Sequence, residues 1–289
     1  MPLMRLSLVP MFEKILKGIK LGFILSCLAF AIIFLAAYYA IYIEPLSLSV
    51  KKVQLHVGLD EPVKLAFISD IHVGSISDDF LKNVVEKVNE ENPDYVLLGG
   101  DFVDSVSDIS RLAPLQKLKA KKGIFAVLGN HDYGFASEIP CPSSEGENSA
   151  GKVAAFLESA NITVLRNNKT DLLDLSLIGI DDFWACRSDF QNATLDVDRS
   201  RPMIVLTHNQ ESIPLYEYNR LNLVLAGHTH CGSIRLPIIG SLPKLFGFKG
   251  DYDAGLHQFD NDSYIYTTCG IGVQPRFLAP PEITVIELT

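Results

Sequence analysis

Side chains that can ligate metal ions follow five short apolar segments of this sequence. They are Asp70 and His72 after residues 64–69, Asp101 after 95–98, Asn130 after 124–128, His208 after 203–207, and His228 and His230 after 222–226. The carboxyl ends of strands in an open α/β sheet form the crevice where ligands bind, so we expect these side chains to meet at one edge. Imidazole combined with carboxylate and amide oxygen suits manganese, iron or zinc.

The histidines support this interpretation because they are few and unevenly placed. The chain has seven, and five of them lie at the predicted strand ends. A single histidine is more often solvated or hydrogen-bonded in the core, and we interpret His56 and His257 in that way. Five histidines placed together with two aspartates and an asparagine predict a metal centre instead.

The elements that must position these residues alternate between strand and helix. Residues 64–69, 95–98 and 124–128 are predicted strands, and 80–91 and 112–121 are predicted helices, the second with Pro114 in its first turn. This order indicates parallel pairing with right-handed crossovers and an α/β fold. Later strands are expected at 172–180, 203–207, 222–226, 263–268 and 283–288, in a mixed sheet or a second packed sheet.

Two segments are predicted to lack regular structure. Residues 135–150 are rich in Ser, Pro, Gly and Glu, which is typical of an inserted loop. Residues 232–250 are apolar but broken by glycine and proline. They would either pack in the core or form an exposed lip that meets lipid or an acyl chain.

Residues 21–43 form an uncharged apolar run that is long enough to cross a bilayer as one helix. A cleaved signal peptide would have a shorter apolar region and a small-residue cleavage site. Basic residues within 1–20 predict a cytoplasmic N-terminus, with the rest of the chain after the helix outside the cytoplasm, although Lys51 and Lys52 weaken this orientation. Residues 44–61 are expected to form a linker or first strand, followed by one domain over 62–289.

Charge and cysteine content limit the other functions. The net charge is −9, and residues 1–20 contribute +3, so the remainder carries −12. An acidic body without a basic, aromatic-rich patch argues against nucleic acid as a partner. The five cysteines, Cys27, Cys141, Cys186, Cys231 and Cys269, lack a Cys-x-x-Cys spacing. A thiolate zinc site is therefore not expected, whereas one or two disulfides would form in an oxidising compartment, with a pairing that the sequence leaves open.

The ordered motifs Asp70-x-His72, Gly100-Asp101, Gly129-Asn130-His131-Asp132, His208 and Gly227-His228-Thr229-His230 resemble those of the calcineurin-like metallophosphoesterases. The resemblance implies a four-layer α/β/β/α sandwich with two mixed sheets and two divalent metal ions, with manganese favoured and iron or zinc as alternatives. It also implies that Asp70, His72 and His230 hold one metal, that Asn130, His208 and His228 hold the other, and that Asp101 bridges them. His131 would face the phosphate, with Asp132 near enough to orient it.

A narrower resemblance, carried by residues 228–237 and 270–284, is to the branch of this family that has an N-terminal membrane anchor. It implies a phosphodiester or pyrophosphate substrate, including lipid-linked ones. The residue after His230 is usually glycine in such sequences, and Cys231 here would put a thiol near the site. Arg235 and Arg276 are candidate ligands for a substrate phosphate. The alternatives are a phosphomonoesterase or phosphoprotein phosphatase with the same site, and a non-catalytic metal-binding scaffold.

Overall fold

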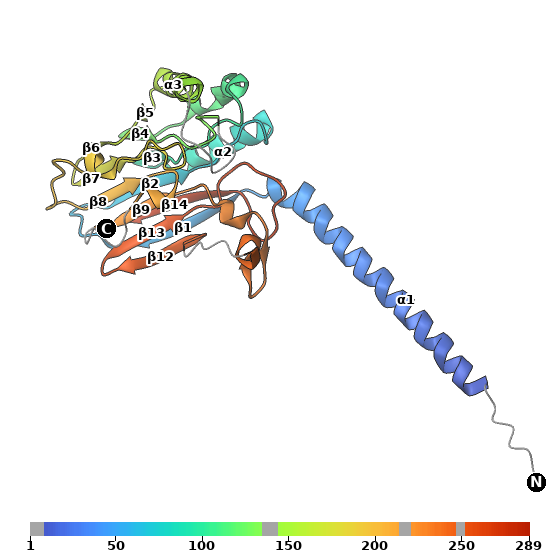
Figure 1. The fold of residues 1–289 in the computed structure, drawn as a ribbon. Helices are drawn as coiled ribbons and strands as arrows, with labels where there is room; N and C mark the ends of the chain where they lie inside the picture. The colour runs from blue at the N-terminus through green and yellow to red at the C-terminus, as the bar shows by residue number, and fades with distance from the viewer. Residues whose placement is uncertain (1–8, 135–143, 214–220, 247–251) are drawn as a thin grey trace, which may run out of the picture.

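The computed structural model describes residues 9–134, 144–213, 221–246 and 252–289, and these form two stacked six-stranded sheets with one long N-terminal helix (Figure 1). The first sheet has the order β1-β14-β2-β3-β4-β5. Its strands are β1 (Ser49–Leu55), β14 (Glu282–Leu288), β2 (Val63–Ile68), β3 (Tyr95–Leu98), β4 (Gly123–Ala126) and β5 (Thr163–Val164). All neighbours are parallel except β14 and β2, so the sheet is mixed.

The second sheet has the order β12-β13-β9-β8-β7-β6 and is also mixed. Its strands are β12 (Gly255–Asp260), β13 (Ser263–Thr267), β9 (Leu223–Ala226), β8 (Met203–Leu206), β7 (Leu175–Gly179) and β6 (Asn168–Leu172). The central four are parallel, and both edge strands are antiparallel to their neighbours. A separate two-stranded hairpin consists of β10 (Arg235–Leu236) and β11 (Gly240–Ser241).

Three apolar clusters define the layers. The first lies between the first sheet and the helices that cover it. The second lies between the two sheets and contains Phe67 of β2 and Leu177 of β7. The third covers the outer face of the second sheet. The helices are α2 (Asp78–Glu90), the 3-10 segment η3 (Val106–Lys117), α3 (Ser144–Ser159) and α4 (Phe190–Ala193), together with short 3-10 turns at Gln210–Ser212, His230–Gly232 and Leu242–Phe246. The predicted α/β class with two mixed sheets is confirmed, although among the described residues the outer layer on the second sheet contains α-helix only in the four-residue α4.

Two local predictions need correction. The helix expected over 112–121 is a 3-10 segment over 106–117, since Pro114 lies inside it and cannot donate the backbone hydrogen bond of an α-helix. Residues 144–150, expected in a loop, begin α3, whose apolar face packs Ala150, Val153 and Leu157 into the helix-side core. Residues 135–143 of that predicted loop, and 247–250 of the predicted 232–250 segment, lie outside the described residues.

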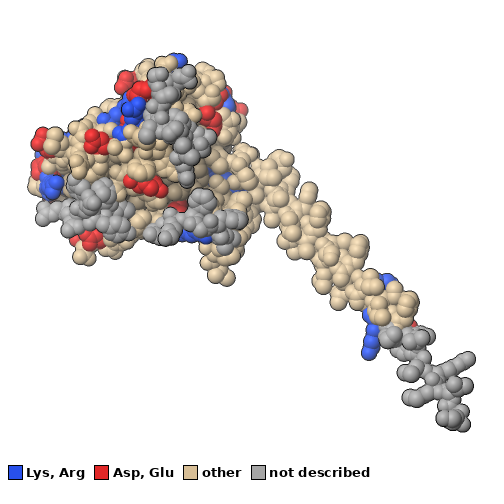
Figure 2. Space-filling model, in the orientation of Figure 1, with Lys and Arg blue, Asp and Glu red and all other residues tan. Residues whose placement is uncertain are grey.

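One N-terminal helix is long and apolar enough to cross a membrane, as the sequence predicts. It comprises α1 (Val9–Tyr38), a π-helical turn (Tyr39–Ile43) and a 3-10 turn (Glu44–Leu46), and its most apolar window has a mean hydropathy of 2.5. Figure 1 shows α1 extending away from the sheets, and Figure 2 shows it free of charged groups along most of its length. The most apolar window of this helix is therefore not covered by any of the described residues.

Candidate metal centre

The predicted ligands lie in the loops that follow β2, β3 and β4 in one sheet and β8 and β9 in the other. Their backbones turn sharply at this edge. Asp70, His72, Asp101, His228 and His230 all have positive φ angles, between 44° and 67°. Non-glycine residues rarely adopt this conformation, and such strain is concentrated at functional sites. The backbone is thus bent at five of the seven predicted ligands.

The first group of ligands is Asp70, His72 and His230, whose donor atoms lie within 4.8 Å of one another. His230 Nε2 is 3.6 Å from Asp70 Oδ1. His72 Nε2 and His230 Nδ1 are buried and have no hydrogen-bond partner among the described residues. Buried polar atoms normally have a partner, so His72 Nε2, which lies 3.5 Å from Asp101 Oδ2, fits a cation that it would ligate.

The second group is Asp101, His208 and His228, with donor atoms inside the same 4.8 Å limit. Asp101 Oδ2 is 3.1 Å from His208 Nε2 and 3.5 Å from His72 Nε2, which belongs to the first group. The Asp101 carboxylate therefore lies between the two groups. Asn130 is buried in the loop after β4 at the same edge.

Outer hydrogen bonds orient two of these imidazoles. His72 Nδ1 is 2.8 Å from Asp104 Oδ1, and His208 Nδ1 is 2.8 Å from the carbonyl oxygen of Gly99. A carbonyl accepts but cannot donate, so His208 Nδ1 carries a proton and donates it to Gly99, which turns Nε2 towards Asp101 and the centre. Asp104 is not among the site residues predicted from the sequence, although its position three residues after Asp101 was a usable signal.

The electrostatics of the centre favour a bound cation. Burial lowers the pKa of His230 to about 3 and that of His228 to about 4, so both are neutral, as ligands must be. Burial alone would raise the pKa of Asp101, but His208 beside it outweighs this effect and lowers the pKa, which keeps the carboxylate anionic. Burial would lower the pKa of His208, but the charge of Asp101 raises it overall. The ligands thus combine anionic oxygens with imidazoles, and their chemistry fits two divalent ions.

His131 lies at the mouth of the centre, partly exposed, with its ring 4.7 Å from the ring of His72. Its backbone N–H donates to Asp101 Oδ1 at 2.8 Å. Burial lowers the pKa of His131. The ring is therefore near the ligands while remaining accessible from outside.

Asp132 is fully buried, and its carboxylate accepts hydrogen bonds from the backbone N–H groups of Gly129, Asp101 and Phe102 at 2.9–3.0 Å. Within the described chain it has no hydrogen bond to the His131 ring, which departs from the orienting role expected from the sequence. Burial raises the pKa of Asp132 to about 7. These hydrogen bonds connect the loop after β3 to the loop after β4, and so they position Asp101.

Arg276 is not placed to bind a substrate, which corrects the expectation from the sequence. Its side chain is fully buried and donates hydrogen bonds to four backbone carbonyls, those of Cys269, Gly272, Val273 and Ala279. A guanidinium surrounded in this way has a structural function, because its donors are already occupied.

Arg235 differs because it is only partly buried. It donates to the carbonyl oxygen of Cys231 at 3.1 Å and lies 3.4 Å from the carboxylate of Asp253. It therefore lies close to the loop that carries His230, with part of its side chain accessible.

Residues 269–279 form the loop whose carbonyls accept hydrogen bonds from Arg276, and this loop packs directly on the first group of ligands. The amide of Gly272 donates to the carbonyl oxygen of Asp70 at 2.7 Å, and a Cβ at Gly270 would lie 2.6 Å from Asp70 Cβ. A disulfide between Cys231 and Cys269 joins this loop to His230. The free thiol expected at Cys231 is therefore wrong. Cys186 is disulfide-bonded as well, and Cys141 lies outside the described residues.

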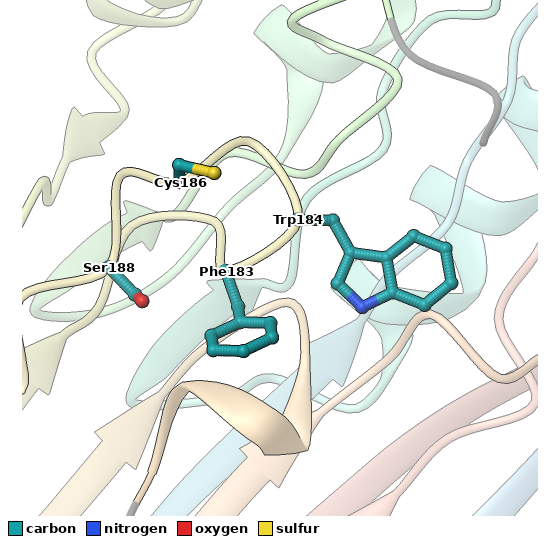
Figure 3. Close-up of a pocket in the computed structure, with 4 residues that line it drawn as sticks. All are labelled: Phe183, Trp184, Cys186 and Ser188. Carbon is teal, nitrogen blue, oxygen red and sulfur yellow. The ribbon is translucent and has the colours of Figure 1, made fainter. Parts of the chain in front are cut away.

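A hollow of about 540 Å³ adjoins the centre, on the loop that follows β7. Phe183, Trp184, Cys186 and Ser188 line it (Figure 3), and the Trp184 ring is 4.2 Å from the ring of His228. Phe183 and Trp184 are not among the site residues predicted from the sequence. Their position after a predicted strand, like that of the ligands, was the available signal.

Comparisons with known proteins agree with this geometry. A family model described as calcineurin-like phosphoesterase matches residues 63–232. A metallophosphoesterase from Helicobacter pylori is 35% identical over 96% of this chain and 72% of its own length. The phosphodiesterase YaeI from Escherichia coli is 31% identical over 78% of this chain and 82% of its own length. The UDP-2,3-diacylglucosamine pyrophosphatase LpxG from Chlamydia trachomatis is 29% identical over 78% of this chain and 83% of its own length.

Proposed function

Since the chain belongs to the calcineurin-like phosphoesterase family, we propose that it is a two-metal hydrolase of a phosphodiester or pyrophosphate bond in an amphiphilic, lipid-linked substrate. The observation that carries the two-metal proposal is the position of Asp101, whose carboxylate lies within 3.5 Å of a histidine from each ligand group. A carboxylate shared in this way is suited to bridge two ions.

In this proposal Asp70, His72 and His230 hold one ion and Asn130, His208 and His228 hold the other. When bound, two divalent ions offset the negative charge of the phosphoryl oxygens and acidify water. His131 hydrogen-bonds to the phosphate and stabilises charge on the leaving oxygen. Asp132 holds the backbone of Asp101 in place, and Arg235 binds a second anionic group of the substrate. Manganese is the proposed metal, with iron or zinc as alternatives.

We also propose that α1 anchors the enzyme as a single membrane span, with the catalytic domain outside the cytoplasm. The support is the uncharged apolar helix, the basic residues near its N-terminus and the Cys231–Cys269 disulfide, which forms in oxidising compartments. The relatives named phosphodiesterase and diacylglucosamine pyrophosphatase support the substrate class.

The test is hydrolysis of bis-p-nitrophenyl phosphate and p-nitrophenyl phosphate by the full chain in detergent, after chelation and again with manganese. We expect manganese to restore diester cleavage. Asp101→Ala should abolish it and lose both ions, whereas Asp104→Asn, which weakens an outer hydrogen bond of His72, should cost about 10–100-fold. Two ions retained by Asp101→Ala would contradict the bridging position. A preference for the monoester would favour the phosphatase alternative.

A further inference from the structure

The β10–β11 hairpin presents an apolar tip to the surroundings of the protein. Pro237, Ile238 and Ile239 connect its strands, and the relative exposures of the two isoleucines are 108% and 49%. Figure 1 shows the orange hairpin extending from the body on the side from which α1 leaves, and the end of this projection is uncharged in Figure 2. Isoleucine at such a tip exposes apolar surface to whatever lies beneath it.

The backbone conformation at Ile238 makes an isoleucine unexpected at this position. Ile238 has φ 73°, a conformation that turns normally give to glycine or asparagine and that a β-branched residue adopts only under strain. Leu278, which is 49% exposed, has φ 55°. The Ile238 side chain is fully exposed, so packing in the fold does not explain its apolar character.

Direct contacts connect the base of the hairpin to the end of the N-terminal helix. The amide of Arg235 donates to the carbonyl oxygen of Phe277 at 2.8 Å, and the Phe277 ring meets the Tyr39 ring edge-on at 6.2 Å. The next amides, those of Leu278 and Ala279, donate to the buried carboxylate of Glu44 at 2.9 Å and 2.6 Å. The hairpin and residues 39–46 are therefore braced against the same short segment.

We infer that the tip, formed by Ile238 and Ile239 with Leu278 beside it, inserts into the bilayer surface as a second membrane contact next to α1. This inference rests on the proposed membrane anchoring. The bilayer is the occupant because the last turns of the membrane helix are packed against the segment that supports the hairpin, so lipid lies within reach of the tip. Apolar residues at an interface typically enter about 5–10 Å into the headgroup and acyl boundary.

The contact would hold the metal centre at a fixed height above the membrane. His230 lies five residues before Arg235, and the Cys231–Cys269 disulfide joins this stretch to the loop on Asp70. A single helix leaves the domain free to tilt relative to the bilayer, whereas a second contact at the hairpin tip restricts this tilt. A phosphate at the headgroup level would then meet the centre without leaving the membrane.

The test uses tryptophan fluorescence in vesicles of phosphatidylcholine and phosphatidylglycerol whose acyl chains carry bromine, which quenches nearby indoles. Trp184 is the sole tryptophan of the chain, so Trp184→Phe gives a silent background. Into it we would place Ile238→Trp or Ile239→Trp in the full-length protein. Phe23→Trp reports on the helix, and Leu195→Trp, at a residue 63% exposed near the opposite edge strand β6, is the matched surface control.

We expect brominated lipid to quench the hairpin probes at least about twofold more than the Leu195 probe, at a depth shallower than the Phe23 probe. Quenching at residue 23 with none at either hairpin position would overturn the inference while leaving the anchor intact. Quenching at none of the three would overturn both. The readout does not depend on hydrolysis, so loss of the proposed activity would not imitate either result.

Discussion

Replacing Arg276 with methionine separates its structural function from the substrate-binding role suggested by the sequence. Methionine keeps much of the side-chain volume but removes every donor. Four backbone carbonyls would lose a charged partner, and Glu44 would lose a nearby positive charge. Hydrogen bonds to charged groups contribute about 1.5–3 kcal/mol each, but removing the guanidinium also relieves its burial, so these values do not add. Removing one partner of a buried ion pair typically lowers the free energy of unfolding by about 3–5 kcal/mol.

For a domain of this size, 1 kcal/mol lowers the melting temperature by about 2–4 °C, so Arg276→Met should lower it by roughly 6–20 °C. Thermal unfolding in detergent at one fixed heating rate measures this shift. In the metal-saturated protein that stays folded, the KM for the diester should remain within about twofold of wild type, while kcat falls because the loop supports Asp70.

Arg235→Met is the matched control, since its ion pair with Asp253 is partly exposed and contributes only about 0–1 kcal/mol. It should melt within about 4 °C of wild type and raise KM instead. The reasoning on Arg276 would be refuted if Arg276→Met melted like the wild type and raised KM about tenfold.

Three further changes test other parts of the site. His131→Ala should lower kcat about 10²–10⁴-fold on an ester with a poor leaving group while two ions stay bound; near-full turnover would exclude a catalytic role. Gly227→Ala should lose metal, measured by elemental analysis, because its Cβ would overlap the Asp70 carboxylate, whereas Gly151→Ala, with open space around it, should keep both ions; equal metal content in the two would contradict the packing. Glu44→Ala should destabilise the domain by about 2–3 kcal/mol in denaturant unfolding, since two backbone amides lose their acceptor, and an unchanged midpoint would show that the helix end is not docked.

The positions of the ligands were predictable because the signal is local. A strand reads as a short apolar run, and the residue after it must lie at the strand's carboxyl end, as Asp70 does after β2 and His228 after β9. The helix α3 gave a weaker signal, because its first turns contain serine, glycine and glutamate, which are equally typical of loops. Its first turns are helical in the fold because Ala150 has a core to pack against.

Functions that depend on tertiary contacts were not predictable. Cys231 and Cys269 are separated by 38 residues, and the parallel pairing of β9 with β13 in the second sheet brings them together. Arginine is a residue type that often binds phosphate, but the acceptors of Arg276 are backbone carbonyls. Every residue has a backbone carbonyl, so the sequence cannot indicate such contacts. Asp132 adjoins His131 in the sequence, yet its carboxylate faces the backbone of the neighbouring loop. Adjacent residues in a tight turn point in different directions, so sequence proximity did not imply contact.

Hydropathy also misplaces the boundary between the helix and the domain. The apolar run ends at Ile43, but Glu44 is 2% exposed and holds the segment that supports both the hairpin and the loop on Asp70. β1 then pairs with β14 in parallel, so of the two alternatives predicted for residues 44–61, a linker or a first strand, residues 49–55 form the strand. A soluble fragment cut at residue 45 would therefore remove a buried carboxylate and its two hydrogen bonds. The end of the N-terminal apolar helix is packed against residues 277–279 of the domain, and assays of the enzyme should retain it.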